Sequence, residues 1–325
     1  TFINDSFVRP QGFYLAGFSS LPLVNVYLIF LSVVYIVTLL SNTLIVSVIW
    51  SEERLHTPKY IAVVNLAVTD ICYSTTLIPQ MIRAFLLKYN FVPYSLCLTQ
   101  MFFAFTFASL ESFSLAILAY DRLIAICFPL RQHYFNTVPK MTCIVFTAWI
   151  VCTVAIAYSV SLMNNLSFCK STTIYSYFCD YAPVFRLACN DYTQQWVTAV
   201  VLSMLIIFVP LMFIICSYLS ILTAVFKMQN LAGRHKALVT CTEHLTLVAL
   251  FYLPILILYI WGFFFLAVDV DIRMLNLSLS ACIPPLMNPI VYTLKTKEIM
   301  NKIPALFRIV KIMNKKFQKH LHFHE

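Results

Sequence analysis

Two acidic residues, Asp70 and Glu111, lie in the middle of long apolar segments in which no basic residue stands at the same depth. Two carboxylates buried in an apolar medium cannot both stay ionised cheaply unless a cation or a proton lies between them. We therefore predict a shared sodium ion or proton at this pair, with Asn42, Ser114 and Asn288 as neighbours. The alternative is two neutral acids, each satisfied by hydrogen bonds. A hydrolase with paired carboxylates is disfavoured, because the sequence implies no aqueous path to them.

The signatures of common enzymes are absent from the chain. No window around the four glycines, Gly12, Gly17, Gly233 and Gly262, completes a G-x-G-x-x-G or a G-x-x-x-x-G-K-[ST] motif. The sequence also lacks H-E-x-x-H, G-x-S-x-G and C-x-x-C. We therefore predict that the protein is not an enzyme.

The elements that carry the acidic pair are apolar segments of membrane-spanning length. Of the 325 residues, 61% are apolar and 11% are charged, which excludes an ordinary soluble domain. A spanning helix needs about 20 mostly apolar residues, and a helix satisfies its own backbone hydrogen bonds in lipid. We predict an all-α fold, a single seven-helix transmembrane bundle. The predicted spans are Leu23–Trp50, Pro58–Leu86, Leu96–Cys127, Met141–Leu162, Val197–Phe226, Ala237–Phe265 and Ile272–Leu294.

The placement of Lys and Arg predicts the orientation of the bundle. Six of these residues lie on the side of the amino terminus and sixteen on the other, which places the amino terminus outside and the basic tail in the cytosol. We predict an extracellular segment over 1–22, a transmembrane domain over 23–294 and a cytoplasmic amphipathic helix and tail over 295–325. The net charge of +9 gathers around the spans, so we expect no nucleic-acid partner. Residues 1–22 lack a basic start and a long apolar run, so the first span is expected to act as its own insertion signal.

Four cysteines fall in the outward segments, where disulfides persist. They are Cys97, Cys169, Cys179 and Cys189, and they allow three pairings. Joining Cys97 to Cys179 would hold the long outer loop over the mouth of the bundle and leave Cys169 to pair with Cys189. Free thiols are the alternative.

Two N-x-[ST] sequons lie on outward segments, at Asn4 and Asn165. Both are predicted glycosylation sites. A third match, at Asn276, lies inside the seventh span and is discounted.

Several motifs resemble those of one receptor family, in the same order along the chain. They are LHTPKY at Leu55–Tyr60, LAYDRLIAIC at Leu118–Cys127, SY at Ser217–Tyr218, RHKALVTCTEH at Arg234–His244 and PLMNPIVY at Pro285–Tyr292. The first, second, fourth and fifth are similar to LHxPMY, MAYDRYVAIC, KAFSTCxSH and PMLNPxIY. The chain thus resembles odorant receptors of the rhodopsin-like, G-protein-coupled class.

Three departures from the family pattern stand out. Phe251–Pro254 reads FYLP where FYGT is usual, Lys59 replaces a methionine and Leu123 replaces a tyrosine. Pro254 is expected to kink the sixth span, because it removes a backbone hydrogen bond. These departures indicate a divergent branch, such as that of the fish receptors.

The resemblance implies a function and a location. It implies a receptor that binds a small odorant and activates a heterotrimeric G protein of the olfactory stimulatory type, which raises cyclic AMP. It also implies the plasma membrane of olfactory sensory neurons.

The resemblance further assigns residues to coupling and activation. They are Asp121, Arg122, Tyr218, His244, Asn288, Pro289 and Tyr292. Asp121 is expected to hold Arg122 in an ion pair until activation, and His244 to lock the sixth span to the third. Asn288 and Pro289 are expected to break the seventh span, so that Tyr292 can swing inward, as Tyr218 can on the fifth. The alternatives are an arginine that reaches toward lipid phosphates, tyrosines that anchor at the interface and a histidine that only packs.

By family geometry, the ligand site lies in the outer half of the bundle. Its candidate residues are Ala104, Phe105, Ala108 and Ser109 on one face of the third span, with Asp180, Tyr181, Val201, Leu202, Ile255, Tyr259 and Ser278 around them. Such a lining suits a small, largely apolar molecule oriented by one or two hydrogen bonds. The third-span face carries no acid, which argues against an amine bound there. Packing alone is the other explanation of these aromatic residues.

The tail carries apolar residues at helical spacing with basic residues between them. The apolar set is Ile299, Ile303, Leu306, Phe307 and Val310. We predict an amphipathic helix on the anionic inner leaflet, with membrane lipids as partners.

Two other classes of function stay open. A non-olfactory receptor of the same class would bind a small lipid or a peptide. A transporter, with Asp70 and Glu111 as coupling acids, is disfavoured because the paired helix interruptions of transporters are missing.

Overall fold

The computed structural model describes residues 9–18, 21–169, 171–263 and 268–295, without the side chains of 262–263 and 292–295. Within these residues, seven helical stretches are long and apolar enough to cross a membrane, and the predicted seven-helix fold is confirmed. They are α1 (Val24–Ser51), α2 (Pro58–Met81, continued to Leu86), α3 (Tyr94–Cys127), α5 (Val138–Ser161), α7 (Thr193–Ser203) continued by α8 (Val209–Lys227), α9 (Leu231–Phe263) and α10 (Val270–Lys295). The predicted Asn4 sequon and tail helix lie outside the described residues.

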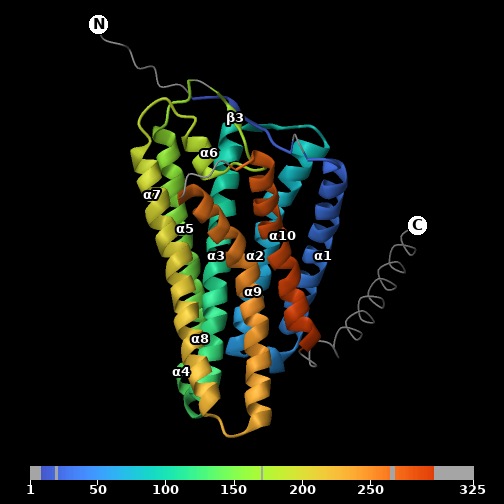
Figure 1. Ribbon diagram of the computed structural model, residues 1–325, viewed down its shortest axis with the longest axis vertical. Helices are drawn as coiled ribbons and strands as arrows, with labels where there is room; N and C mark the ends of the chain where they lie inside the picture. The colour runs from blue at the N-terminus through green and yellow to red at the C-terminus, as the bar shows by residue number, and fades with distance from the viewer. Residues whose placement is uncertain (1–8, 19–20, 170, 264–267, 296–325) are drawn as a thin grey trace, which may run out of the picture.

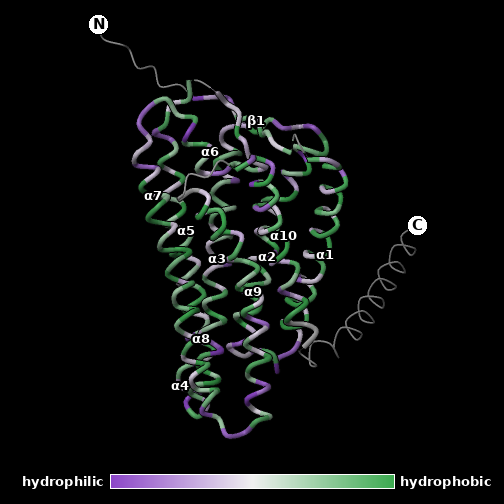
Figure 2. Tube along the Cα trace, in the orientation of Figure 1, coloured by the Kyte–Doolittle hydropathy of each residue, from purple (hydrophilic) through white to green (hydrophobic). Residues whose placement is uncertain are grey.

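The bundle is arranged as a membrane protein requires. Hydrophobic residues cover its middle and hydrophilic residues gather at its two ends (Figure 2). Helix α3 runs through the centre, and 67% of its most apolar window is buried, against 11% for the stretch α7–α8 (Figure 1). Helix α3 is therefore surrounded by other helices and can contact several of them. Most of α7–α8 is left to face lipid.

The stretch α7–α8 is joined by a π-helical turn, Met204–Phe208. Pro210 follows this turn and has no N–H to donate to the carbonyl of Ile206, four residues before it. A proline therefore leaves one backbone acceptor free inside the membrane, where every such group needs a partner.

Loops at the outer end meet in a three-stranded sheet of order β2-β1-β3. The central strand β1 (Gly12–Leu15) comes from the amino-terminal segment, pairs antiparallel with β2 (Phe91–Pro93) and runs parallel to β3 (Thr173–Ile174). The side chains of Phe13 and Leu15 are 0% and 1% exposed, whereas Tyr14 between them points outward. The amino-terminal segment therefore belongs to the folded core of the outer end.

Short helices complete the fold at both ends. Helix α4 (Gln132–Phe135) lies in the inner loop between α3 and α5, and α6 (Tyr181–Phe185) lies in the outer loop before α7 (Figure 1).

Strand β1 supplies a test of this outer fold. We expect Phe13→Ala to lower the free energy of unfolding by about 3–5 kcal/mol, because it removes a fully buried ring. Thermal unfolding of the purified protein in detergent measures this loss. Tyr14→Ala is the matched control, since the ring of Tyr14 is 47% exposed. Equal effects of the two substitutions would show that β1 is not packed as described.

Candidate functional site

The acidic pair lies at the centre of the bundle, as its sequence position predicts. Asp70 on α2 and Glu111 on α3 are 0% and 1% exposed, and their carboxyl groups are close enough to interact. Asn288 on α10 donates from Nδ2 to both oxygens of Asp70, at 3.1 and 2.9 Å. Three helices therefore meet at one cluster of oxygen atoms.

A small cavity adjoins this cluster and is lined by Leu66, Glu111, Leu115, Leu247, Phe251, Pro284 and Asn288. The cavity has a volume of ≈ 10 Å³, which is about the room that one water molecule needs. The Oδ1 atom of Asn288 is buried and receives no hydrogen bond from the residues that the structure describes. Carboxylate and amide oxygens are ligands for hard cations, so the residues present suit a sodium ion as well as a proton. Within the described residues, no group of three or more His, Cys, Asp or Glu side chains is placed to hold a metal ion.

The other two predicted neighbours of the pair have different partners. Asn42 donates to the carbonyl oxygens of Thr38 and Pro285, both at 3.0 Å. The carbonyl of Pro285 needs such a donor because Pro289, four residues on, has no N–H. The hydroxyl of Ser114 instead receives a hydrogen bond from Asn65 at 2.7 Å.

A second polar cluster lies at Ser112, one residue after Glu111. The Ser112 hydroxyl donates to the free carbonyl of Ile206 at 2.7 Å and is 2.8 Å from the hydroxyl of Tyr252. Ser112 is fully buried, and the three groups belong to α3, the π-helical turn and α9. One hydroxyl therefore joins the third, fifth and sixth spans.

At the inner end, α9 is held against its neighbours by His244. Nδ1 of His244 lies 2.7 Å from the hydroxyl of Tyr218 on α8, and the two rings stack with centroids 5.7 Å apart. The backbone of Leu115 in α3 lies close to the same imidazole. Arg122 of α3 is near enough to affect both His244 and Cys241 of α9 electrostatically.

The expected ion pair between Asp121 and Arg122 is not formed. Within the described residues, Asp121 accepts a hydrogen bond from Nδ2 of Asn136 at 2.8 Å, and the ion pair that the structure contains lies at the outer end. Successive residues on a helix point in directions about 100° apart, so neighbours in sequence do not face each other. Asp121 thereby fixes the inner loop that contains α4.

Asn288 and Pro289 lie in α10, where the resemblance predicts a break in the seventh span. The helix continues through Pro284, Pro285 and Pro289 to Lys295. Tyr292 belongs to this helix, and the direction of its side chain lies outside the description.

At the outer end, a lid made of residues 174–180 closes the mouth of the bundle. The structure contains both disulfides, Cys97–Cys179 and Cys169–Cys189. The first ties the lid to α3. Gln100 of α3 adds a hydrogen bond to the lid, because its Oε1 accepts from the amide of Cys179 at 3.2 Å, and its Nε2 donates to the carbonyl of Thr76 on α2 at 3.2 Å. Because Tyr177, Phe178 and Cys179 are all buried, the lid is inserted into the bundle.

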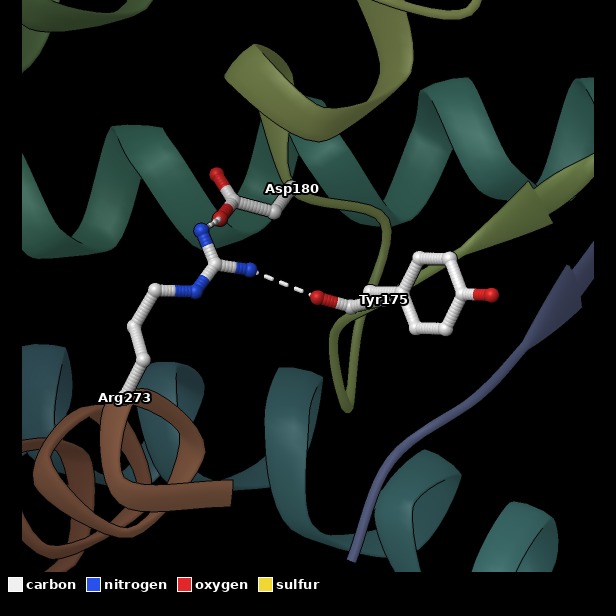
Figure 3. Close-up of polar contacts among 3 residues, drawn as sticks. All are labelled: Tyr175, Asp180 and Arg273. Atoms are coloured by element: carbon white, nitrogen blue, oxygen red, sulfur yellow. Dashed lines mark hydrogen bonds and ion pairs between the residues drawn. The ribbon is translucent and has the colours of Figure 1, made fainter. Parts of the chain in front are cut away.

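An arginine on α10 holds the opposite side of the lid (Figure 3). Nη2 of Arg273 donates to the carbonyl of Tyr175 at 2.6 Å, and Nη1 lies 3.9 Å from Oδ2 of Asp180. Burial raises the pKa of the Asp180 carboxyl, and the positive charge of Arg273 opposes this rise.

The structure brings several predicted ligand residues together beneath this lid. Phe105 has its ring 6.2 Å from that of Phe178 and 6.3 Å from that of Tyr181. Ala104 and Ser109 are buried, and Ala108 is half-buried. The hydroxyl of Ser109 donates to the carbonyl of Phe105 in its own helix.

The remaining candidates are more scattered. Tyr259 packs against Phe208 and Ile255 against the cluster around Tyr252, so both lie between the fifth and sixth spans. Ser278 is hydrogen bonded to Tyr27 of α1 at 2.6 Å, which places it on the α1 side of α10. Leu202 is half-buried, and Val201 is 50% exposed in the least buried span. The structure therefore does not bring Ser278 or Val201 to the group around Phe105.

Three further residues belong to this region and were not among the sequence candidates. Tyr177 and Phe178 are buried side chains of the lid, and Tyr73 of α2 is near Glu111 and Asp180. The signal for the lid pair was their place directly before Cys179, since a disulfide to α3 draws its neighbours inward. Tyr73 gave no such signal, because the resemblance places the ligand site among the third, fifth, sixth and seventh spans and Tyr73 lies on the second.

Asn165 ends the short turn after α5 and is exposed at the outer end. Its side chain is therefore accessible in the folded chain, as a glycosylation site must be.

Comparisons with known proteins agree on one family. The profile described as "Olfactory receptor" matches residues 31–311. The chain is 36% identical to human olfactory receptor 1L6 over 91% of its length and 85% of the relative, and 34% identical to human olfactory receptor 1L3 over 96% of each. It is 33% identical to rat olfactory receptor 1468 over 87% of the chain and 88% of the relative.

The Ser112 cluster can be tested by removing one hydroxyl. We expect Ser112→Ala to lower the free energy of unfolding by about 1–3 kcal/mol, because the Ile206 carbonyl and the Tyr252 hydroxyl both lose a buried partner. Thermal unfolding in detergent is the measurement. Ser109→Ala is the control and should cost below about 1 kcal/mol, since Ser109 bonds only to a carbonyl of its own helix. Wild-type stability of Ser112→Ala would contradict the assignment.

Proposed function

The chain belongs to the olfactory receptor family, and on this basis we propose that it binds a small odorant in the outer half of the bundle and activates the stimulatory olfactory G protein. Membership of this family makes it a multi-pass membrane receptor and not an enzyme. Activation of that G protein raises cyclic AMP.

The observation that supports G-protein coupling is a contact at the inner end of the bundle. The contact of His244 with Tyr218 holds α9 against α8, and Arg122 of α3 is near enough to act electrostatically on His244. A G protein needs this end to open, so the odorant must bind the open state more tightly than the closed one. Breaking one or two hydrogen bonds is a barrier that a small ligand can overcome.

The surface offered to the G protein includes the loop that contains α4. Leu130 is 98% exposed there, and Tyr134 is 71% exposed. The hydrogen bond from Asn136 to Asp121 fixes this loop relative to Arg122. An exposed leucine in a fixed loop suits a hydrophobic depression on a partner protein.

The odorant site that we propose is the aromatic group beneath the lid. Phe105 and Tyr181 carry over from the sequence candidates, and Phe178 adds a third ring. Rings and alkyl groups suit a small apolar ligand that is oriented by few polar contacts.

For the acidic pair, we propose a sodium ion or a shared proton that favours one state of the receptor. Asp70, Glu111 and Asn288 supply the oxygen atoms, and the adjoining cavity has room for one small particle. A bound cation removes the repulsion between two close carboxylates, and a shared proton converts it into a hydrogen bond.

We expect Arg122→Ala to abolish the cyclic AMP response to odorants, while antibody staining shows undiminished delivery to the cell surface. The matched control is Arg54→Ala, which removes the same charge from an exposed position in the loop between α1 and α2. An Arg122→Ala receptor that still signals would contradict the role of Arg122.

We expect agonist affinity to change when sodium is replaced by choline at constant ionic strength, and to lose this dependence in Asp70→Asn and Glu111→Gln. Radioligand competition on membranes measures the affinity. Asp191→Asn, which changes an exposed acid in the outer loop, should keep the dependence of the parent. A parent that is indifferent to sodium would rule out the ion and leave the shared proton or two neutral acids.

A further inference from the structure

The carboxyl group of Asp180 is only weakly neutralised by its partner. Arg273 gives its short hydrogen bond to the carbonyl of Tyr175, at 2.6 Å, and lies 3.9 Å from Oδ2 of Asp180 (Figure 3). The attraction between charges weakens with distance, and a charge-assisted hydrogen bond is typically about 2.8 Å long. A cation that approached Asp180 more closely would therefore bind it better than Arg273 does.

The charge of Asp180 acts on residues inside the bundle. Its charge reaches the phenol groups of Tyr73 on α2, Tyr177 on the lid and Tyr259 on α9. Its side chain nevertheless keeps 15% of its surface exposed, so a small molecule can still touch it. The negative charge of this acid thus acts on side chains of three elements that border the proposed odorant site.

The phenol of Tyr73 is an unused polar group in the same region. Its ring packs against two of the hydrophobic clusters of the bundle, and its hydroxyl is near Glu111, Cys282 and Asp180. No hydrogen bond to this hydroxyl is found among the residues that the structure describes, and the oxygen is not fully enclosed. A polar atom in this position is available to a ligand.

Aromatic residues lie on both sides of Asp180 in the chain, Tyr177 and Phe178 before it and Tyr181 after it. The ring of Phe105 lies near those of Phe178 and Tyr181, and the rings of Tyr177 and Phe178 are 4.9 Å apart. A carboxylate bordered by aromatic faces recognises an ammonium group, because the faces carry negative charge density and the carboxylate a full negative charge.

We propose that the odorant is a small alkylamine whose protonated nitrogen binds the Asp180 carboxylate while its alkyl part lies against Phe105 and Phe178. An alkylamine is protonated at neutral pH, as lysine is. The acid comes from the lid, which agrees with the absence of an acid on the third-span face. This inference rests on the proposed function and names the ligand class of the same site.

The test compares two probes of equal shape, hexylamine and 1-hexanol, in cells that express the full-length receptor and report cyclic AMP. The parent should respond to the amine at lower concentration than to the alcohol. Asp180→Asn should raise the half-maximal amine concentration by about tenfold to a hundredfold and leave the alcohol response unchanged. The retained alcohol response shows that this variant is folded and delivered.

Two further variants separate ligand binding from a structural role of the ion pair. Arg273→Gln removes the competing cation and also the bond that holds the lid at Tyr175, so the amine response should be kept or strengthened relative to the alcohol response. Asp191→Asn changes an exposed acid of the same loop and should alter neither response. If Arg273→Gln weakened the amine response as much as Asp180→Asn does, the pair would only fasten the lid and the proposal would be overturned.

The probes also distinguish this proposal from the function on which it rests. A parent that responds to the alcohol and not to the amine would overturn the amine and leave odorant reception intact. A parent that is silent toward both, with clear surface staining, would overturn the amine and count against odorant reception as well.

Discussion

A backbone carbonyl that loses its donor to a proline must find another donor, because lipid offers none. The structure meets this requirement twice with side chains from a neighbouring helix. Ser112 donates to the Ile206 carbonyl that Pro210 leaves free, and Asn42 donates to the Pro285 carbonyl that Pro289 leaves free. Each proline thus creates a contact between helices that apolar packing alone would not specify. The polar centre of the bundle depends on these contacts, since Asp70, Glu111 and Asn288 adjoin them.

The polar groups of the bundle form two sets, which join different helices. One set runs from Asp180 at the outer mouth past Tyr73 to Glu111 and Asp70, and its members inside the membrane belong to α2, α3 and α10. The other joins the sixth span to the third and fifth, through Tyr252 and His244. Within the first set, side chains tie α2, α3 and α10 to one another at the centre of the bundle. The second set consists of side-chain hydrogen bonds that can break singly.

The fold followed from the sequence because lipid imposes it. A span needs about 20 apolar residues and must satisfy its own backbone, so composition alone placed the seven helices to within a few residues for most of them. The sheet at the outer end did not follow, because no membrane constrains residues 9–18. Its only local signal was the alternation of Phe13, Tyr14 and Leu15, which is too short to predict a strand. Side-chain partners were the least predictable part. Asp121 was expected to bind its neighbour Arg122, yet helix geometry separates adjacent residues and Asp121 binds Asn136 from the next loop.

The position of Pro254 decides which part of α9 can move. The proline lies inside the helix, and its own carbonyl accepts a hydrogen bond from Asn276 of α10 at 2.9 Å. This bond fixes the point at which the helix is weakest, because a proline removes one bond from the helical ladder. The arm on the inner side of Pro254 is held by Tyr252 close to the hinge and by His244 further along. A rotation about Pro254 would displace His244 more than Tyr252, because His244 lies further from the proline. Arg122 acts electrostatically on His244, so such a rotation would change the surroundings of the residue on which the response to the ligand is proposed to depend.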